Sequence, residues 1–176
     1  MLFRSVPHFE KMLYDQATLL AAYTHAYQVT GADHLRRVIE STVGYVLRDL
    51  ATDGPGWASA EDADSEGIEG RFYLWSPDDV AAVCADPATT AAVCEWFGVG
   101  ASGNFTDPHT GFTGTILTVR DVGAEPPPVV AAAIPALLAA RARRVRPGLD
   151  DKVLLAWNAW FLRSLVEAAQ IGRAHV

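Results

Sequence analysis

The sequence predicts an all-α fold class, in which hairpins of long helices form part of a toroid and a small β-ribbon is inserted between them. Apolar residues recur at steps of three and four over two adjacent segments, residues 13–30 and 33–50, which is the pattern of amphipathic helices. Residues 53–75 interrupt this pattern with turn-forming, acidic and strand-like stretches. No exact sequence repeat is visible, so the toroid is predicted from the arrangement of these segments alone.

The first two helices are predicted to form an antiparallel hairpin. The apolar positions are Leu13, Ala17, Leu20, Tyr23 and Tyr27 in the first segment, and Leu35, Ile39, Val43, Val46 and Leu50 in the second. Between the segments, Gly31 is a typical helix stop and Asp33 is a favourable N-cap. A turn this short places the two helices side by side and antiparallel.

The middle of the chain is predicted to contain short strands and short helices. Residues 57–61 and 71–75 have strand-like composition, and an acidic loop, residues 62–70, lies between them. Ser76-Pro77 starts a helix that runs to about Ala85, and Pro87 opens a second one that runs to about Phe97. A long loop, residues 98–114, precedes another predicted short strand, residues 115–119.

Two further helices are predicted in the last third of the chain. Three consecutive prolines at 126–128 break the chain, and an alanine-rich helix follows to about Val145, with a bend at Pro135. Asp150 or Asp151 is predicted to cap the final helix. The apolar stripe of that helix consists of Leu154, Trp157, Phe161, Leu165 and Ala168.

Composition excludes several classes of protein. The 176 residues are 50% hydrophobic and 20% charged, which is typical of a folded globular chain. The net charge of -7 argues against a nucleic-acid partner, and the arginine run 141–146 lacks interleaved aromatic residues. No apolar stretch is long enough to span a membrane. Cys84 and Cys94 form no CxxC pair, which favours reduced, structural cysteines and a cytoplasmic location.

The two ends of the chain resemble sequencing adapters rather than protein. Leu2-Phe3-Arg4-Ser5 and Ile171-Gly172-Arg173-Ala174-His175-Val176 are peptides that a common adapter pair encodes. We therefore expect residues 1–5 and 171–176 to be extraneous. Residues 6–170 are then expected to be an incomplete (α/α) barrel domain.

Three motifs resemble a known family. They are Val6-Pro7-His8-Phe9-Glu10-Lys11-Met12-Leu13-Tyr14-Asp15, the segment from Ser59 to Trp75, and Asp150-Asp151-Lys152-Val153-Leu154-Leu155-Ala156-Trp157-Asn158. In this order and spacing the chain closely resembles the YyaL-type family of thioredoxin-domain-containing proteins, which is related to a spermatogenesis-associated protein. Family members usually have Gly where this chain has Ala159, a departure that bears on helix packing more than on chemistry.

The resemblance implies a fold and a range of functions. It implies an N-terminal thioredoxin-like domain, absent here, followed by an (α/α)6 barrel similar to N-acylglucosamine 2-epimerases and six-hairpin glycosidases, of which this chain is the middle part. A carbohydrate-active-like barrel would bind or process a sugar-like molecule, and hydrolysis and epimerisation both remain open. The alternative is a non-catalytic module that serves the thioredoxin-like domain in cis. No cofactor, nucleic acid or membrane partner is expected.

The acidic loop allows three interpretations. Asp62, Asp64 and Glu66 imitate the start of an EF-hand calcium loop, but its twelfth position is Tyr73 instead of a bidentate glutamate. A second interpretation is a solvated turn stabilised by its own aspartates. The third, which we favour, is that the loop supplies carboxylates, including Glu61, to a sugar cleft.

The other two motifs also contain groups suited to acid–base chemistry. His8, Glu10 and Lys11 precede a helix, and could act as acid–base groups or be ordinary surface charges. Asn158 lies near an apolar stripe, where its amide either bridges helices or points into a cavity. Trp57, Tyr73 and Trp75 could stack on a sugar ring, although aromatic residues on a ribbon are more often core.

These motifs together give a predicted site. The predicted catalytic residues are His8, Glu10, Asp62, Asp64 and Asp151, and the predicted substrate-binding residues are Lys11, Asp15, Glu61, Glu66, Tyr73, Trp75, Trp157 and Asn158. No metal ligands are predicted. If the toroid is right, His8, Glu61 or Asp62, and Asp150 or Asp151 lie at one rim of the helical layer, since loops at one end of such a layer carry function.

Overall fold

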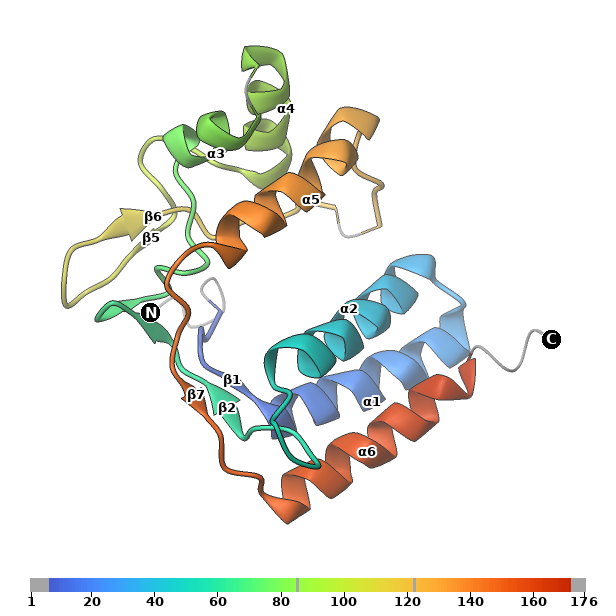
Figure 1. The fold of residues 1–176 in the computed structure, drawn as a ribbon. Helices are drawn as coiled ribbons and strands as arrows, with labels where there is room; N and C mark the ends of the chain where they lie inside the picture. Colours follow the sequence, from blue (N-terminus) through green and yellow to red (C-terminus); the bar gives the residue numbers. More distant parts are fainter. Residues whose placement is uncertain (1–6, 85, 122, 172–176) are drawn as a thin grey trace. The chain divides into compact units, whose positions relative to one another are not determined.

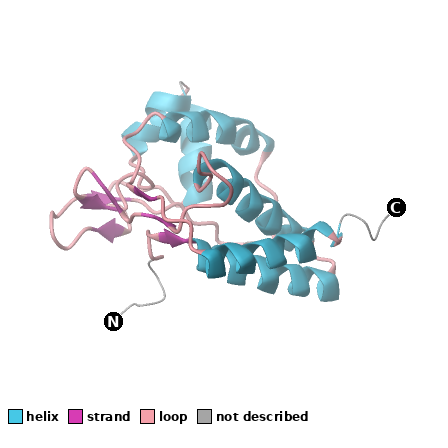
Figure 2. Ribbon diagram, turned by 60° about the horizontal axis from the view of Figure 1, so that its bottom comes forward, coloured by secondary structure: helices cyan, strands magenta, loops and turns pink. Residues whose placement is uncertain are grey.

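The computed structural model describes residues 7–84, 86–121 and 123–171. It consists of two compact units: unit 1 contains residues 1–9 and 63–147, and unit 2 contains residues 10–62 and 148–176. Figures 1 and 2 show that helices make up most of the described structure and that the strands are short. Of the predicted extraneous ends, all but Ile171 lie outside the described residues.

Unit 2 contains the predicted helical hairpin and the last helix. Helices α1 (Leu13–Thr30) and α2 (Asp33–Asp49) form the hairpin, and α6 (Leu155–Ala169) packs against α1 (Figure 1). Gly31 ends α1 with a left-handed φ of 66°, and its N–H donates to the carbonyl oxygen of Tyr27. The predicted N-cap is wrong: Asp33 is the first residue of α2, Ala32 takes the cap position, and no side chain caps the helix.

The core of unit 2 consists of the predicted apolar stripes. Side chains of α1, α2 and α6 are buried together with residues of the connecting segment: Leu13, Ala17, Leu20, Ile39, Val46, Leu50, Ala58 and Phe161. Trp57 lies edge-on to Phe161, with ring centroids 4.9 Å apart. Helices α1 and α6 therefore cover each other, although they belong to opposite ends of the sequence.

Helix α6 is apolar on a second face as well. Leu155, Leu162 and Val166 recur on the side away from Phe161, and their exposures are 84%, 52% and 54%. We call these three residues the exposed α6 face. A helix with apolar residues on two sides can pack against two neighbours.

A three-stranded antiparallel sheet accompanies these helices in unit 2. Its strands are β1 (Lys11–Met12), β2 (Ala60–Glu61) and β7 (Leu149–Asp150), with β2 in the centre. The strand predicted over 57–61 is thus shorter, and Trp57 forms only an isolated bridge with Ala51. The predicted cap of the last helix is also wrong, because Asp150 lies in β7 and Leu154 takes the N-cap position of α6.

The described residues of unit 1 form three helices and two β-ribbons. The helices are α3 (Pro77–Cys84), α4 (Pro87–Phe97) and α5 (Pro128–Ala142), each of which starts at a proline. The ribbons pair β3 (Asp64–Ser65) with β4 (Ile68–Glu69), and β5 (Phe105–Thr106) with β6 (Thr113–Gly114). The helix starts at Pro77 and Pro87 are therefore confirmed, and the alanine-rich helix ends before Val145.

The strand predicted over residues 71–75 is wrong. The N–H groups of Tyr73 and Leu74 donate to the carbonyl oxygen of Gly70, which makes this segment a turn. Only Trp75 pairs, in an isolated bridge with Thr115, so the strand predicted over residues 115–119 is reduced to one bridged residue. An aromatic run becomes a strand only where a second segment offers a ladder of partners, and this segment has a single one.

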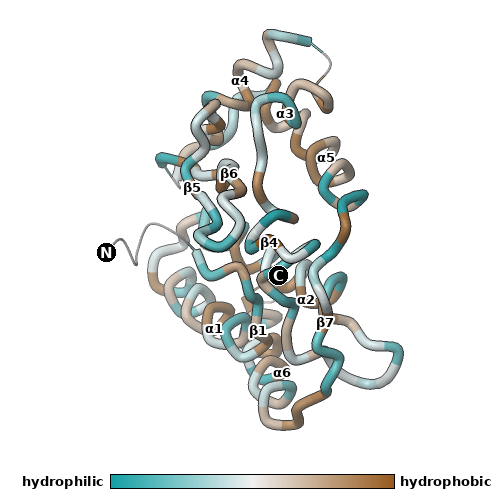
Figure 3. Tube along the Cα trace, turned by 90° about the vertical axis from the view of Figure 1, so that its left-hand side faces the viewer, coloured by the Kyte–Doolittle hydropathy of each residue, from teal (hydrophilic) through white to brown (hydrophobic). Residues whose placement is uncertain are grey.

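The core of unit 1 lies between its three helices. Trp75, Val80, Val93, Val130 and Leu137 are buried together. The hydrophobic colouring of α5 in Figure 3 reflects its run of alanine, valine and leucine, part of which faces this core. None of the described helices is both long and apolar enough to cross a membrane.

Candidate functional site

The sheet of unit 2 brings parts of all three sequence motifs together. Lys11 of the first motif lies opposite Glu61 of the second, and Glu61 lies opposite Leu149. On the neighbouring positions, Ala60 lies opposite Asp150 of the third motif. Residues separated by about 50 and 90 positions in sequence are therefore cross-strand neighbours in one small sheet.

The two faces of this sheet differ. Because successive side chains of a strand point to opposite faces, Lys11 and Glu61 share one face, and Asp150 lies on the other. Glu61 is 2% exposed, and the hydroxyl of Tyr45 donates to its Oε2 at 2.8 Å. Glu61 is therefore a buried, hydrogen-bonded carboxylate on the inner face.

The other face carries exposed carboxylates. The Asp62 N–H donates to the Gly148 carbonyl oxygen at 2.8 Å, which extends the β2–β7 pairing by one residue. A Cβ atom at position 148 would lie 4.0 Å from Asp62 Oδ2, an ordinary van der Waals distance, so the Asp62 side chain lies over Gly148. Asp62 and Asp150 are then diagonal neighbours on adjacent strands, a relation that separates the two backbones by about 7–8 Å.

Asp150 has a charged partner. Lys152 Nζ lies 2.9 Å from Oδ1 and 3.0 Å from Oδ2 of Asp150. This hydrogen bond from Lys152 lowers the pKa of Asp150 and raises the pKa of Lys152. Asp151, the predicted catalytic residue, is exposed beside this pair. The pair therefore favours the ionised form of Asp150.

Two predicted substrate-binding residues of α6 make contacts within unit 2. The amide of Asn158 accepts from Trp57 N at 2.7 Å and donates to the carbonyl oxygens of Trp57 at 3.0 Å and Leu154 at 3.1 Å. Of the two alternatives for this amide, the structure therefore has the bridging one. Trp157 packs against the core, edge-on to Tyr14 with centroids 4.8 Å apart.

The remaining predicted residues of unit 2 flank the sheet. Glu10 and Lys11 are half-buried at β1, and Asp15 is half-buried in the first turn of α1. His8, which is exposed, belongs to unit 1 instead. The rim shared between His8 and the carboxylates of unit 2 stays a prediction.

The acidic loop folds as a tight hairpin in unit 1. Glu66 and Gly67 connect β3 to β4, and their φ angles of 55° and 75° are those of a type I′ turn. Asp64 lies opposite Glu69 in the ribbon. A two-residue turn cannot wrap a calcium ion in the manner of an EF-hand loop, and the part of the chain that the structure describes contains no group of three acidic, His or Cys residues suited to a metal.

The predicted aromatic wall is mostly core. Trp75 is 4% exposed. Tyr73 is half-buried and stacks on Phe9, with centroids 6.3 Å apart. Phe9 in turn lies edge-on to Phe105, with centroids 5.1 Å apart. Trp75 is thus largely closed to a sugar ring in unit 1.

Comparison with known proteins shows a partial relationship. Human spermatogenesis-associated protein 20 is 34% identical over 183 residues, which cover 87% of this chain and 23% of the human protein. The rat protein of that name is 33% identical over 196 residues, which cover 94% of this chain and 25% of the rat protein. An uncharacterized protein of Caenorhabditis elegans is 31% identical over 194 residues, which cover 94% of this chain and 26% of that protein. The chain is homologous to part of these proteins.

This homology is to a region and not to the whole. The chain spans about a quarter of the length of spermatogenesis-associated protein 20. No family model matches the chain. The homology therefore relates the described fold to a region of spermatogenesis-associated protein 20 without assigning that region an activity.

Sequence reasoning missed two features of the structure. Asp107 is 1% exposed and accepts from the Thr110 hydroxyl at 2.5 Å and from His109 N at 2.9 Å, which lowers its pKa. The arginine run contacts aromatic rings after all. Arg141 lies over Phe72 and Tyr73, Arg144 over Trp75, and Arg146 over Phe72. The rings come from a distant segment, so no interleaving is visible in sequence.

Proposed function

We propose that this chain is one segment of an (α/α)6 barrel domain in a longer protein, and that this domain binds and processes a sugar-like molecule by acid–base chemistry. The observation that carries the proposal is the meeting of three distant motifs in the β1–β2–β7 sheet of unit 2. A core does not require charged motifs to meet in this way, whereas an acid–base site does.

The exposed carboxylates Asp62 and Asp150 are the proposed reacting groups. Diagonal neighbours have Cα atoms about 7–8 Å apart, and side chains on one face at that spacing can place their carboxyl groups at the roughly 6.5–9.5 Å of an inverting glycosidase. Asp150, whose carboxylate form is stabilised by Lys152, is the proposed base. Glu10 of the neighbouring motif is a further candidate acid. An epimerase would use the same groups to remove and return a proton at one carbon.

The exposed α6 face supports the barrel. In a ring of hairpins each helix is covered on two sides, and Leu155, Leu162 and Val166 would pack against a neighbouring hairpin outside this chain. The longer protein is also proposed to carry a thioredoxin-like domain before the barrel, as the family resemblance implies.

The test uses the intact protein that contains this region. Unlabelled sugars and aryl glycosides are incubated with it, and NMR of the anomeric protons separates hydrolysis from epimerisation. Asp62→Asn and Asp150→Asn are expected to lower turnover at least about 100-fold, and Glu10→Gln is expected to impair it. Asp62→Asn and Asp150→Asn should leave the melting temperature nearly unchanged, because exposed carboxylates contribute little to stability. Glu10 is half-buried, and Gln keeps the size of its side chain.

The matched control is Asp53→Asn. Asp53 is an exposed carboxylate of the same unit that makes no ion pair with the described residues, and its substitution should leave turnover unchanged. Equal effects of all four substitutions, or no turnover of any sugar by the unsubstituted protein, would contradict the proposal.

The second candidate is a non-catalytic module that serves the thioredoxin-like domain. Three predicted site residues favour this candidate, because their side chains already bridge or pack within the chain: Asn158, Trp157 and Trp75. Saturable sugar or protein binding without any product in the NMR assay would select this candidate.

A further inference from the structure

Unit 1 contains a cavity lined by arginines. Its volume is about 580 Å³, within the range of small-molecule sites. Arg71, from the turn after the β3–β4 ribbon, and Arg143 and Arg144, from the segment after α5, contribute guanidinium groups to the lining. Glu66 and Asp79 are the carboxylates that line the same cavity. Cationic groups therefore outnumber carboxylates in a chain whose net charge is -7.

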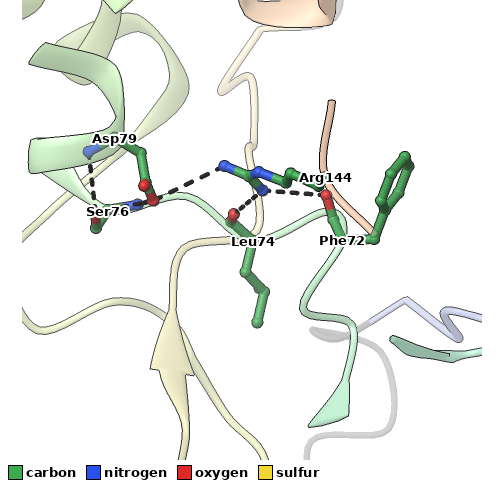
Figure 4. Close-up of polar contacts among 5 residues, drawn as sticks. All are labelled: Phe72, Leu74, Ser76, Asp79 and Arg144. Atoms are coloured by element: carbon green, nitrogen blue, oxygen red, sulfur yellow. Dashed lines mark hydrogen bonds and ion pairs between the residues drawn. The ribbon is translucent and has the colours of Figure 1, made fainter. Parts of the chain in front are cut away.

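Arg144 is held rigidly and uses only part of its hydrogen-bonding capacity. Its Nη1 donates to the carbonyl oxygens of Phe72 at 3.1 Å and Leu74 at 2.6 Å (Figure 4), and its guanidinium carbon lies 4.3 Å from the centroid of the Trp75 ring. These two bonds use both Nη1 hydrogens. Nη2 and Nε make no hydrogen bond to any described residue, so three of the five donors remain available.

Asp79 does not neutralise Arg144 fully. Its Oδ2 lies 3.8 Å from Arg144 Nη2, which is too long for a hydrogen bond. The same oxygen accepts from both the N–H and the hydroxyl of Ser76, each at 2.9 Å, at the start of α3 (Figure 4). Burial lowers the pKa of Arg144, and the neighbouring charges of Arg141 and Arg71 act in the same direction. Arg144 is thus a half-buried cation with incomplete compensation.

The guanidinium of Arg143 is exposed and lines the cavity. Its backbone N–H donates to the Ala140 carbonyl oxygen at 3.2 Å, but the guanidinium makes neither an ion pair nor a hydrogen bond with a residue that the structure describes. Arg71 differs, because its Nε lies 3.0 Å from Glu66 Oε2. The available cationic donors of the cavity are therefore the guanidinium of Arg143 and the Nη2 and Nε atoms of Arg144.

We propose that this cavity binds the oxyanion of a small molecule, a carboxylate or a phosphate group, through Arg143 and the available donors of Arg144. Guanidinium groups match both anions because they offer parallel N–H donors in a fixed plane. The rigid seat of Arg144 on two carbonyl oxygens and the Trp75 ring orients that plane before any ligand arrives. This anion site belongs to unit 1 and is independent of the carboxylate site proposed in unit 2.

The test is calorimetric titration of the intact protein with inorganic phosphate and, separately, with acetate. Sodium chloride keeps the ionic strength constant, so that general screening does not imitate binding. Saturable binding of at least one probe is expected, and the probe that binds more tightly distinguishes a phosphate site from a carboxylate site. Arg143→Gln is expected to weaken that binding about tenfold, because it removes a charge-assisted contact.

The matched control is Arg120→Gln, which removes another exposed arginine of unit 1 that lies outside the cavity lining. It should change the affinity by less than about twofold, since exposed charges act weakly at a distance. Arg144→Lys retains the charge but loses the planar donors, and a larger loss of affinity than with Arg120→Gln is expected while the circular dichroism stays unchanged. Absence of binding of both probes, or equal losses from Arg143→Gln and Arg120→Gln, would overturn the proposal.

Discussion

Asn158→Asp is expected to loosen α6 from the segment around Trp57. The change keeps the size of the side chain and the acceptor for Trp57 N, but it replaces the Nδ2 donor by an oxygen. Nδ2 donates to two carbonyl oxygens, those of Trp57 and Leu154, at 3.0 and 3.1 Å. Losing two hydrogen bonds at about 1 kcal/mol each, together with repulsion between the new oxygen and those carbonyls, gives a loss of roughly 2–3 kcal/mol.

Hydrogen–deuterium exchange of the α6 amides in the intact protein measures this loss locally. A loss of that size makes exchange of the α6 amides roughly 30- to 150-fold faster. The matched control is Asn104→Asp. The Asn104 amide forms the same kind of two-way bridge, donating to Ile116 O at 2.9 Å and accepting from Ile116 N at 2.7 Å. Asn104 is exposed, so water can replace the lost donor, and its variant should lose under about 1 kcal/mol.

The same experiment separates bridging from ligand binding by Asn158. If Asn158 bridges α6 to the segment around Trp57, its substitution changes the exchange protection of the α6 amides without any sugar present. If Asn158 only binds a ligand, its substitution leaves that protection unchanged. Protection of α6 within about 0.5 kcal/mol of the unsubstituted protein, or equal effects of the two variants, would refute the bridging argument.

Three further predictions concern other elements. Gly70→Ala should destabilise unit 1 by about 1–3 kcal/mol, because φ is 73° at this position and a Cβ atom would lie 2.5 Å from the Phe9 ring. The loss should be measured as faster amide exchange in unit 1, and unchanged exchange would contradict the prediction. Asp86→Ala removes the side chain that accepts from Thr89 N at 2.8 Å, a bond that lowers the pKa of Asp86. A lowered carboxyl pKa stabilises above the ordinary value of 3.8 and ceases to do so as pH falls through the lowered value, so thermal melts of the variant and the unsubstituted protein should differ at pH 7 and converge in acid. The 176-residue chain alone should self-associate in sedimentation velocity through the exposed α6 face, and Leu162→Glu should reduce association. A monomer with a sharp cooperative melt would refute the interpretation of the chain as an incomplete barrel domain.

Elements with local signals could be predicted from the sequence, and those with distant partners could not. Gly31 ends α1, and Pro77 and Pro87 begin α3 and α4, because the conformations of glycine and proline are restricted by their own covalent structure. The same local reasoning predicts Asp33, and Asp150 or Asp151, as helix caps. Asp150 instead lies in β7 and pairs with Ala60 of β2, a partner 90 positions away that no local rule reveals.

The predicted apolar stripes of α1 and α6 are covered within unit 2. Leu20 and Phe161 are fully buried, because the two helices cover each other, and the residues of the exposed α6 face lie on another side of that helix. For the candidate site, the motifs themselves could be chosen from sequence, and their meeting in one sheet could not be derived from it. The arginine cavity escaped prediction because its aromatic and carbonyl partners are some 70 positions from Arg144.

Unit 2 is discontinuous, and the hydrogen bond between Asp62 and Gly148 marks the place where the chain leaves it and returns. Strands β2 and β7 are antiparallel and adjacent there, in the geometry that a two-residue turn closes in a β-hairpin. Residues 63–147 are thus topologically an insert between the arms of a hairpin. An Asn-Gly turn in their place would connect Asp62 to Gly148, so residues 63–147 could be replaced without a change in the register of the sheet.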